Sequence, residues 1–216
     1  MTDQEIIKYL EKCSFYELTP ETCQYNILDC LDDMSCGYQS FWGSTKLVLW
    51  FNNTDFVIKI PFEGEFHYNG DDEEEFIPFC GNGCNWDYCA VEETEYQRAC
   101  ESQIEQCFAK TSYFCTIDGH PIYKQPYVEM YNHFQEKSHH TEEDSKKAQE
   151  LYEKSDGVSG GLPKGWMADV VNYFGDKIFS KLLDFLSSSD INDLHSGNVG
   201  YLNGAPVLVD YSGFYE

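Results

Sequence analysis

The order of apolar and polar residues predicts strands in the first half of the chain. Two apolar runs, 46–51 and 56–60, flank the sequence Asn-Asn-Thr-Asp at 52–55, which favours a turn. This pattern predicts a β-hairpin. Two later segments, 112–118 and 121–130, have the same strand character and are expected to form a second pair of strands.

Apolar residues spaced three and four apart predict helices elsewhere in the chain. The expected helices cover 3–12, 20–34, 87–108, 141–154, 166–174 and 178–186. Thr141 with Asp144 resembles a capping box at the start of one of them. Near the C-terminus, Asn203-Gly204 predicts a tight turn between strands 199–202 and 206–209.

This order of elements predicts an α+β fold with two lobes. The expected parts are an N-terminal helical extension at 1–34, a strand-rich lobe at 35–130 and a helical lobe at 131–216. Residues 62–85 are acidic and contain Gly and Cys, so they are interpreted as an insertion in the strand-rich lobe. A hinge is expected near 125–131.

The charge of the chain narrows its possible partners. The 216 residues carry a net charge of −24 and a single arginine, Arg98. Eleven acids and no bases lie between Ile60 and Gln97, and the run 71–75 is interpreted as a solvated loop. Because like charges repel, we expect neither nucleic acid nor anionic membrane as a partner. No apolar run is long enough to span a bilayer, and the acidic N-terminus does not resemble a signal peptide, so a cytoplasmic location is expected.

Cysteine and histidine residues offer alternative sites. The ten cysteines are interpreted as small buried hydrophobes, since a cytoplasmic protein rarely forms disulfides. Cys80, Cys84 and Cys89, with His67 nearby, could instead hold zinc, although their spacing is unusual for such a site. The pair at 139–140, His-His, is interpreted as a surface feature.

The most informative motifs lie near the C-terminus. Residues 193–198 read Asp-Leu-His-Ser-Gly-Asn, and Asp210-Tyr-Ser-Gly follows after the expected hairpin. Together they resemble the catalytic core of the protein-kinase-like fold, closest to its small-molecule branch of aminoglycoside and choline kinases. The resemblance implies that Asp193 is the catalytic base, that Asn198 and Asp210 bind Mg²⁺, and that ATP is the phosphate donor.

The strand-rich lobe contains further matches to this fold. Val57-Ile58-Lys59 resembles the strand whose lysine contacts ATP and pairs with a glutamate on the next helix. Glu92 fits that glutamate best, because it stands four residues before an apolar position; Glu93 and Glu95 remain alternatives.

Other expected nucleotide contacts come from loops. The glycine-rich phosphate loop of the family is absent, and Gly43 and Ser44 lie where it should be. Tyr127, Val128 and Glu129 match the hinge whose backbone would meet the adenine edge.

Two functions follow from the resemblance, which covers 35–216 and ends six residues after the last motif aspartate. The first is an ATP- and Mg²⁺-dependent phosphotransferase with an unknown acceptor, in a minimal version of the fold that is truncated at its C-terminus. The second is a non-catalytic kinase-like module that binds a nucleotide or inhibits a protein partner through its acidic surface.

Overall fold

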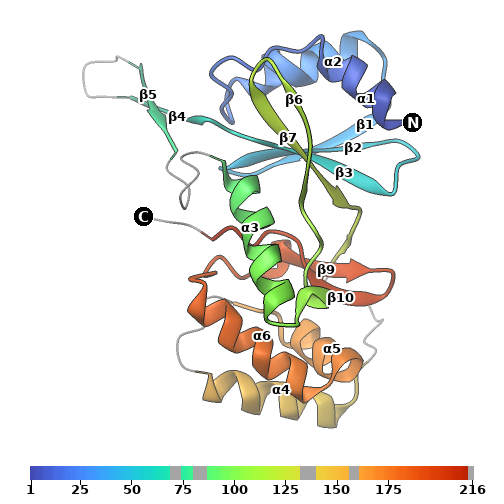
Figure 1. Cartoon of the computed structure of the whole chain (residues 1–216), viewed down its shortest axis with the longest axis vertical. Helices are drawn as coiled ribbons and strands as arrows, with labels where there is room; N and C mark the ends of the chain where they lie inside the picture. Colours follow the sequence, from blue (N-terminus) through green and yellow to red (C-terminus); the bar gives the residue numbers. More distant parts are fainter. Residues whose placement is uncertain (69–73, 80–86, 132–139, 156–160, 214–216) are drawn as a thin grey trace. The chain divides into compact units, whose positions relative to one another are not determined.

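The structure, a computed structural model, describes five segments of the chain, namely residues 1–68, 74–79, 87–131, 140–155 and 161–213. They form two compact units. The first contains residues 1–93 and 111–127, and the second contains 94–110 and 128–213. The expected α+β class is confirmed, because strands and helices are both extensive (Figure 1).

The first unit is built on an antiparallel sheet. Among the described residues it has five strands in the order β1 (Tyr38–Trp42), β2 (Lys46–Phe51), β3 (Phe56–Pro61), β7 (His120–Pro126) and β6 (Ser112–Ile117). The expected β2–β3 hairpin is confirmed, with Val48 opposite Lys59. Strand β1 was not predicted, because its residues are partly or fully exposed and lack a clear apolar alternation.

The two faces of this sheet differ in chemistry, because successive side chains of a strand point to opposite faces. One face carries buried Leu47, Leu49, Ile58 and Ile60. These side chains share a core with residues of α1 (Asp3–Leu10), of a π-helical segment (Gln24–Leu28) and of α2 (Asp29–Asp33), which lie on the same sheet (Figure 1). The other face carries Lys46 and Lys59.

The acidic insertion contains more structure than expected. Strands β4 (Gly64–Tyr68) and β5 (Glu74–Pro78) form a two-stranded hairpin, so the interpretation of the run 71–75 as a loop is wrong for residues 74 and 75. A Cβ atom at Gly64 would lie 2.2 Å from the Ile77 carbonyl oxygen, so the pairing requires glycine there. Most of the acidic run, 71–73, lies outside the described residues.

Helix α3 (Tyr88–Glu101) is shorter than expected. The sequence predicted helix as far as 108, but Gln103 has a φ of 58°, which ends regular helix. A short 3₁₀ turn, Glu105–Cys107, follows. Residues 88–93 of the helix belong to the first unit and residues 94–101 to the second.

The second unit combines helices with a small sheet. Its elements are α4 (Glu142–Lys154), α5 (Lys164–Phe174), α6 (Asp176–Ser188), β8 (Glu129–Met130), β9 (Val199–Leu202) and β10 (Ala205–Leu208). Trp166, Phe179 and Leu182 are fully buried in its core. The predicted capping box of α4 and the Asn203-Gly204 turn are both present.

A buried histidine in the first unit gives a pH-dependent prediction. His120 is 2% exposed, one of its ring nitrogens contacts the Pro61 carbonyl oxygen, and burial lowers its pKa from 6.5 to about 4. At a pH between these two values, the histidine binds a proton in the unfolded chain but not in the folded chain. The contribution of His120 to the unfolding free energy is therefore greatest above pH 6.5, and it falls by up to about 3 kcal/mol as the pH drops to 4.

Chemical denaturation of wild type and His120→Gln from pH 4 to 7 measures this effect. The unfolding free energy of wild type minus that of His120→Gln should increase as the pH rises from 4 to 7. The comparison isolates the histidine from Glu63, whose carboxylate lies 3.6 Å from it and whose pKa is raised by burial. A difference that is constant with pH contradicts the prediction.

The described part of the chain has no helix long and apolar enough to cross a membrane.

The interpretation of the histidine pair as a surface feature is wrong for His140, whose side chain is only 16% exposed and whose Nδ1 lies 2.8 Å from Asp169 Oδ1. The Tyr201 hydroxyl donates to the other oxygen of the same carboxylate. His139 lies outside the described residues.

Candidate functional site

The lysine and glutamate expected from the sequence form a buried ion pair in the first unit. Lys59 Nζ lies 2.7 Å from Glu92 Oε1 and 2.5 Å from Oε2, so one ammonium group contacts both carboxylate oxygens. The side chains are 3% and 0% exposed. Removing two charged groups from water is costly, and the short, direct hydrogen bonds between Lys59 and Glu92 offset that cost.

Local sequence explains how the two residues meet. Strand alternation turns Lys59 away from the apolar face that carries Ile58 and Ile60. Asp87 caps the start of α3 by accepting a hydrogen bond from the Ala90 N–H, 2.9 Å away. Its other carboxylate oxygen accepts from the Tyr123 hydroxyl on β7, which ties the helix start to the sheet. Burial raises the pKa of the Asp87 carboxyl.

A second lysine, which sequence reasoning missed, shares the same carboxylate. Lys46 Nζ on β2 donates to Glu92 Oε1 over 2.8 Å, and its side chain is 4% exposed. The Thr111 hydroxyl donates to Oε2 over 2.5 Å and accepts from Gln125 Nε2 over 2.9 Å. Alternation along the β2–β3 hairpin puts Lys46 on the same face as Val48 and Lys59, but it does not indicate that Lys46 reaches Glu92.

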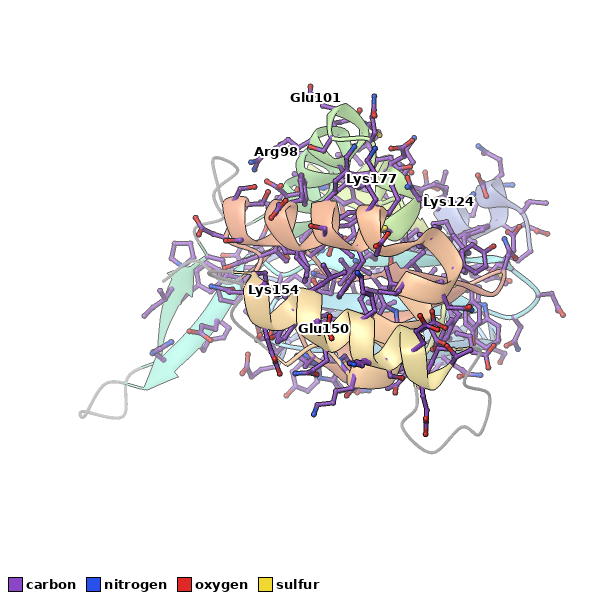
Figure 2. All side chains as sticks on the ribbon, turned by 90° about the horizontal axis from the view of Figure 1, so that it is seen from below. Arg98, Glu101, Lys124, Glu150, Lys154 and Lys177 are labelled. Atoms are coloured by element: carbon purple, nitrogen blue, oxygen red, sulfur yellow. The ribbon has the colours of Figure 1, made fainter. Side chains whose placement is uncertain are left out.

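The alternative glutamates have other contacts. Glu93 Oε1 accepts from the Tyr113 N–H in the first unit. In the second unit, Glu95 Oε1 accepts from Arg98, 2.7 Å away, and the guanidinium lies over the Phe185 ring (Figure 2 labels Arg98). Glu92 is therefore the residue that pairs with Lys59.

In the second unit the motif at 193–198 forms a compact loop. Asn198 is 6% exposed, and its Nδ2 donates to the Asp193 carbonyl oxygen over 2.6 Å and to Oδ2 over 3.2 Å. His195 Nε2 lies 3.6 Å from Asp193 Oδ1, while its Nδ1 accepts from the Gly197 N–H. The Asp193 carboxylate thus has Asn198 on one oxygen and His195 near the other. Because Nδ2 is the donor in both bonds of Asn198, its amide oxygen is the atom that could bind a metal.

The loop that follows is anchored by its aromatic residue. Tyr211 is fully buried, and its hydroxyl donates to the Ala109 carbonyl oxygen over 2.9 Å. Just before it, the Val209 N–H donates to the Asn198 carbonyl oxygen over 3.0 Å, which connects the two motifs. Gly213 has a φ of 72°, a conformation that favours glycine. The backbone on both sides of Asp210 is thus held in place.

The other residues that were predicted to contact the nucleotide lie in or next to connections between strands. Gly43 and Ser44 are exposed in the three-residue connection between β1 and β2. The Tyr127 N–H donates to the Asp55 carbonyl oxygen, so this group is already used within the sheet. Val128 is buried, and Glu129 pairs with Tyr201 in the small sheet of the second unit.

The described residues include no group of three or more His, Cys, Asp or Glu that could hold a metal. Asn198 and Asp210 nevertheless supply oxygen atoms, the ligands that Mg²⁺ prefers, and Mg²⁺ usually takes only one or two protein ligands beside substrate phosphates. Of the proposed zinc ligands, Cys80 and Cys84 lie outside the described residues. Cys89 is fully buried, which raises the pKa of its thiol well above the usual range.

No protein-family model matches the chain, and a search of curated proteins finds no match. Among solved structures, it is similar to the proinflammatory kinase CtkA of Helicobacter pylori, with 14% identity, a TM-score of 0.35 and 82% of this chain covered. It is also similar to the spectinomycin phosphotransferase APH(9)-Ia, solved with ADP and spectinomycin, with 11% identity, a TM-score of 0.33 and 81% covered. The chain spans 56% and 65% of their lengths, less than two thirds of each.

Proposed function

We propose that the protein is an ATP- and Mg²⁺-dependent phosphotransferase of the protein-kinase-like class. The observation that carries this proposal is the buried pair of Lys59 and Glu92, formed between a strand and the next helix as the motifs imply. A pair with no exposed carboxylate contributes little to solubility and is weak evidence for stability, so a role in positioning the ammonium group explains it better.

The proposed roles follow the chemistry of phosphoryl transfer, which depends on positioning and charge neutralisation. Lys59, oriented by Glu92, contacts the ATP phosphates, and backbone groups at Gly43 and Ser44 lie beside them. Val128 and Glu129 present backbone groups to the adenine edge. Tyr127 belongs to the same hinge, although its own N–H bonds within the sheet.

Asp193 is proposed as the base. Its carboxylate takes the proton of the acceptor hydroxyl while the acceptor oxygen bonds to the γ-phosphorus and the bond to the β-phosphate oxygen breaks, which releases ADP. Asn198 Nδ2 donates to one oxygen of this carboxylate and to the backbone carbonyl of the same residue, which orients the carboxylate in the loop. Asn198 and Asp210 would hold Mg²⁺ through oxygen atoms, and the bound ion would neutralise phosphate charge.

A second candidate is a kinase-like module that binds a nucleotide without turnover and meets a protein partner through its acidic surface. The net charge of −24 and the base-free stretch between Ile60 and Gln97 favour this candidate. The two functions share nucleotide binding and differ in catalysis, so one experiment separates them.

A thermal-shift measurement with ATP, with and without Mg²⁺, tests nucleotide binding. Wild type should melt at a higher temperature with both present, since ligand binding stabilises the folded state by mass action. Asp210→Ala should lose the Mg²⁺-dependent part of the shift. Asp184→Ala, which removes an exposed carboxylate from α6, is the matched control and should behave like wild type.

Release of ADP in the same samples separates the two candidates. Turnover supports the phosphotransferase, and a shift without turnover supports the binding module. The absence of both a shift and turnover in wild type contradicts both proposals.

A further inference from the structure

Two cysteines of the first unit lie close together although they belong to different segments of the chain. Cys13 follows α1, and Cys30 is part of α2. Cys30 Sγ donates to the Lys12 carbonyl oxygen over 3.3 Å. Cys13 Sγ in turn lies 3.9 Å from the Ile27 carbonyl oxygen, one helical turn before Cys30. Each sulfur therefore contacts the backbone of the segment that carries the other cysteine.

The same two segments are also joined by their backbones. The N–H of Ser14, the residue after Cys13, donates to the Asn26 carbonyl oxygen over 3.0 Å. Cys13 is part of the buried core of the first unit, and Cys30 packs against that core. The closeness of the two cysteines is therefore a property of the packed N-terminal helices.

The two thiols differ in exposure and also interact directly. Cys13 is only 6% exposed, whereas Cys30 is partly exposed to solvent. Burial raises the pKa of the Cys13 thiol, and a hydrogen bond with the Cys30 thiol raises it further. The thiolate is the form that reacts with an oxidant, and access to solvent favours the reaction. Cys30 is therefore the thiol that reacts first, and Cys13 stays protonated beside it.

A third cysteine lies nearby but is less suited to pair with Cys13. Cys36 is buried, and its thiol donates to the Leu31 carbonyl oxygen of the preceding helix over 3.3 Å. It acts on the Cys13 thiol through charge, whereas Cys30 acts through a hydrogen bond as well. The geometry thus favours Cys30 as the partner of Cys13.

We propose that Cys13 and Cys30 form a reversible disulfide when the protein meets hydrogen peroxide. The Cys30 sulfur attacks one peroxide oxygen, the O–O bond breaks, and the products are a sulfenic acid on Cys30 and one water, which takes the proton of the Cys30 thiol. The Cys13 sulfur then bonds to the Cys30 sulfur. The S–O bond breaks, and the hydroxyl group leaves with the Cys13 proton as a second water. The two thiols lose two electrons, which reduce one peroxide to two waters.

The bridge would join the segment after α1 to α2, and both share a core with the apolar face of the sheet. A disulfide stabilises the folded state mainly because it restricts the unfolded chain, here between residues 13 and 30. In a reducing compartment, a thiol such as glutathione would attack the bridge and restore both cysteines by exchange. The pair would therefore couple the stability of the N-terminal helices to oxidation, which goes beyond the proposed phosphotransferase function.

Peptide mapping of wild type after treatment with hydrogen peroxide tests the proposal. The remaining thiols are alkylated, and the protein is cleaved after acidic residues, which separates the two cysteines because Glu17 and Asp29 lie between them. Mass spectrometry should find a linked pair of peptides with Cys13 and Cys30, and dithiothreitol should remove the link. Recovery of Cys13 in alkylated form, or a link between Cys30 and Cys36 in its place, overturns the proposal.

The melting temperature gives a second test, with variants. Oxidised wild type should melt about 5 °C higher than the reduced protein, because the bridge restricts the unfolded chain. Cys30→Ser should lose this rise. Cys36→Ser removes the neighbouring thiol and should keep the rise as the matched control. An equal rise in Cys30→Ser and wild type overturns the proposal, and the mapping of wild type decides the case in which a variant does not fold.

Discussion

Asp193→Asn is expected to lower the rate of ATP turnover about 10²- to 10⁴-fold, the usual contribution of a general base. Asparagine has the same shape, and its side-chain oxygen can accept the hydrogen bond that Asn198 Nδ2 donates to Oδ2. The bond from Asn198 to the backbone carbonyl of residue 193 does not depend on the side chain. The loop should therefore keep its conformation and lose only the group that accepts the proton.

Measurement of ADP release together with the thermal shift distinguishes this effect from misfolding. The variant should keep the ATP- and Mg²⁺-dependent rise in melting temperature and lose turnover. Asp184→Asn, on the exposed side of α6, serves as the control and should keep both. A variant with the rate of wild type contradicts the assignment of Asp193 as the base.

Local patterns predicted much of the fold and the paired residues of the site. Alternation identified the β2–β3 hairpin and placed Lys59 opposite the apolar face, because a strand has a period of two. The turn at Asn203-Gly204 was likewise predicted, because this dipeptide favours a tight turn with positive φ at both residues. Both residues have positive φ in the structure. The choice of Glu92 required the family motif, and the observed contact agrees with it.

Long-range contacts were harder to predict. Lys46 and Glu92 are 46 positions apart, and a spacing of this size carries no signal in a single sequence. The same holds for His140 and Asp169, which are 29 positions apart. The β4–β5 hairpin was missed because its acidic residues favour a loop, while the pairing depends on the close approach that Gly64 allows.

Glu92→Gln is expected to lower the unfolding free energy by about 3–5 kcal/mol, the usual cost of removing one partner from a buried ion pair. Glutamine has nearly the same volume but no charge, so two ammonium groups lose the anion that both of them contact. Glu101→Gln, in the last turn of the same helix and exposed to solvent (Figure 2), should change stability by less than about 0.5 kcal/mol.

Urea denaturation of the two variants measures this difference, and equal stabilities contradict the account of Glu92 as a buried counter-charge. The triple variant Lys46→Met, Lys59→Met, Glu92→Leu replaces the charges with apolar groups of similar size, and such replacements are often neutral or stabilising. It should therefore recover most of the lost stability while remaining unable to bind ATP. Recovery of stability without recovery of binding would show that the cluster is kept for its ligand, because an apolar core at this position folds as well.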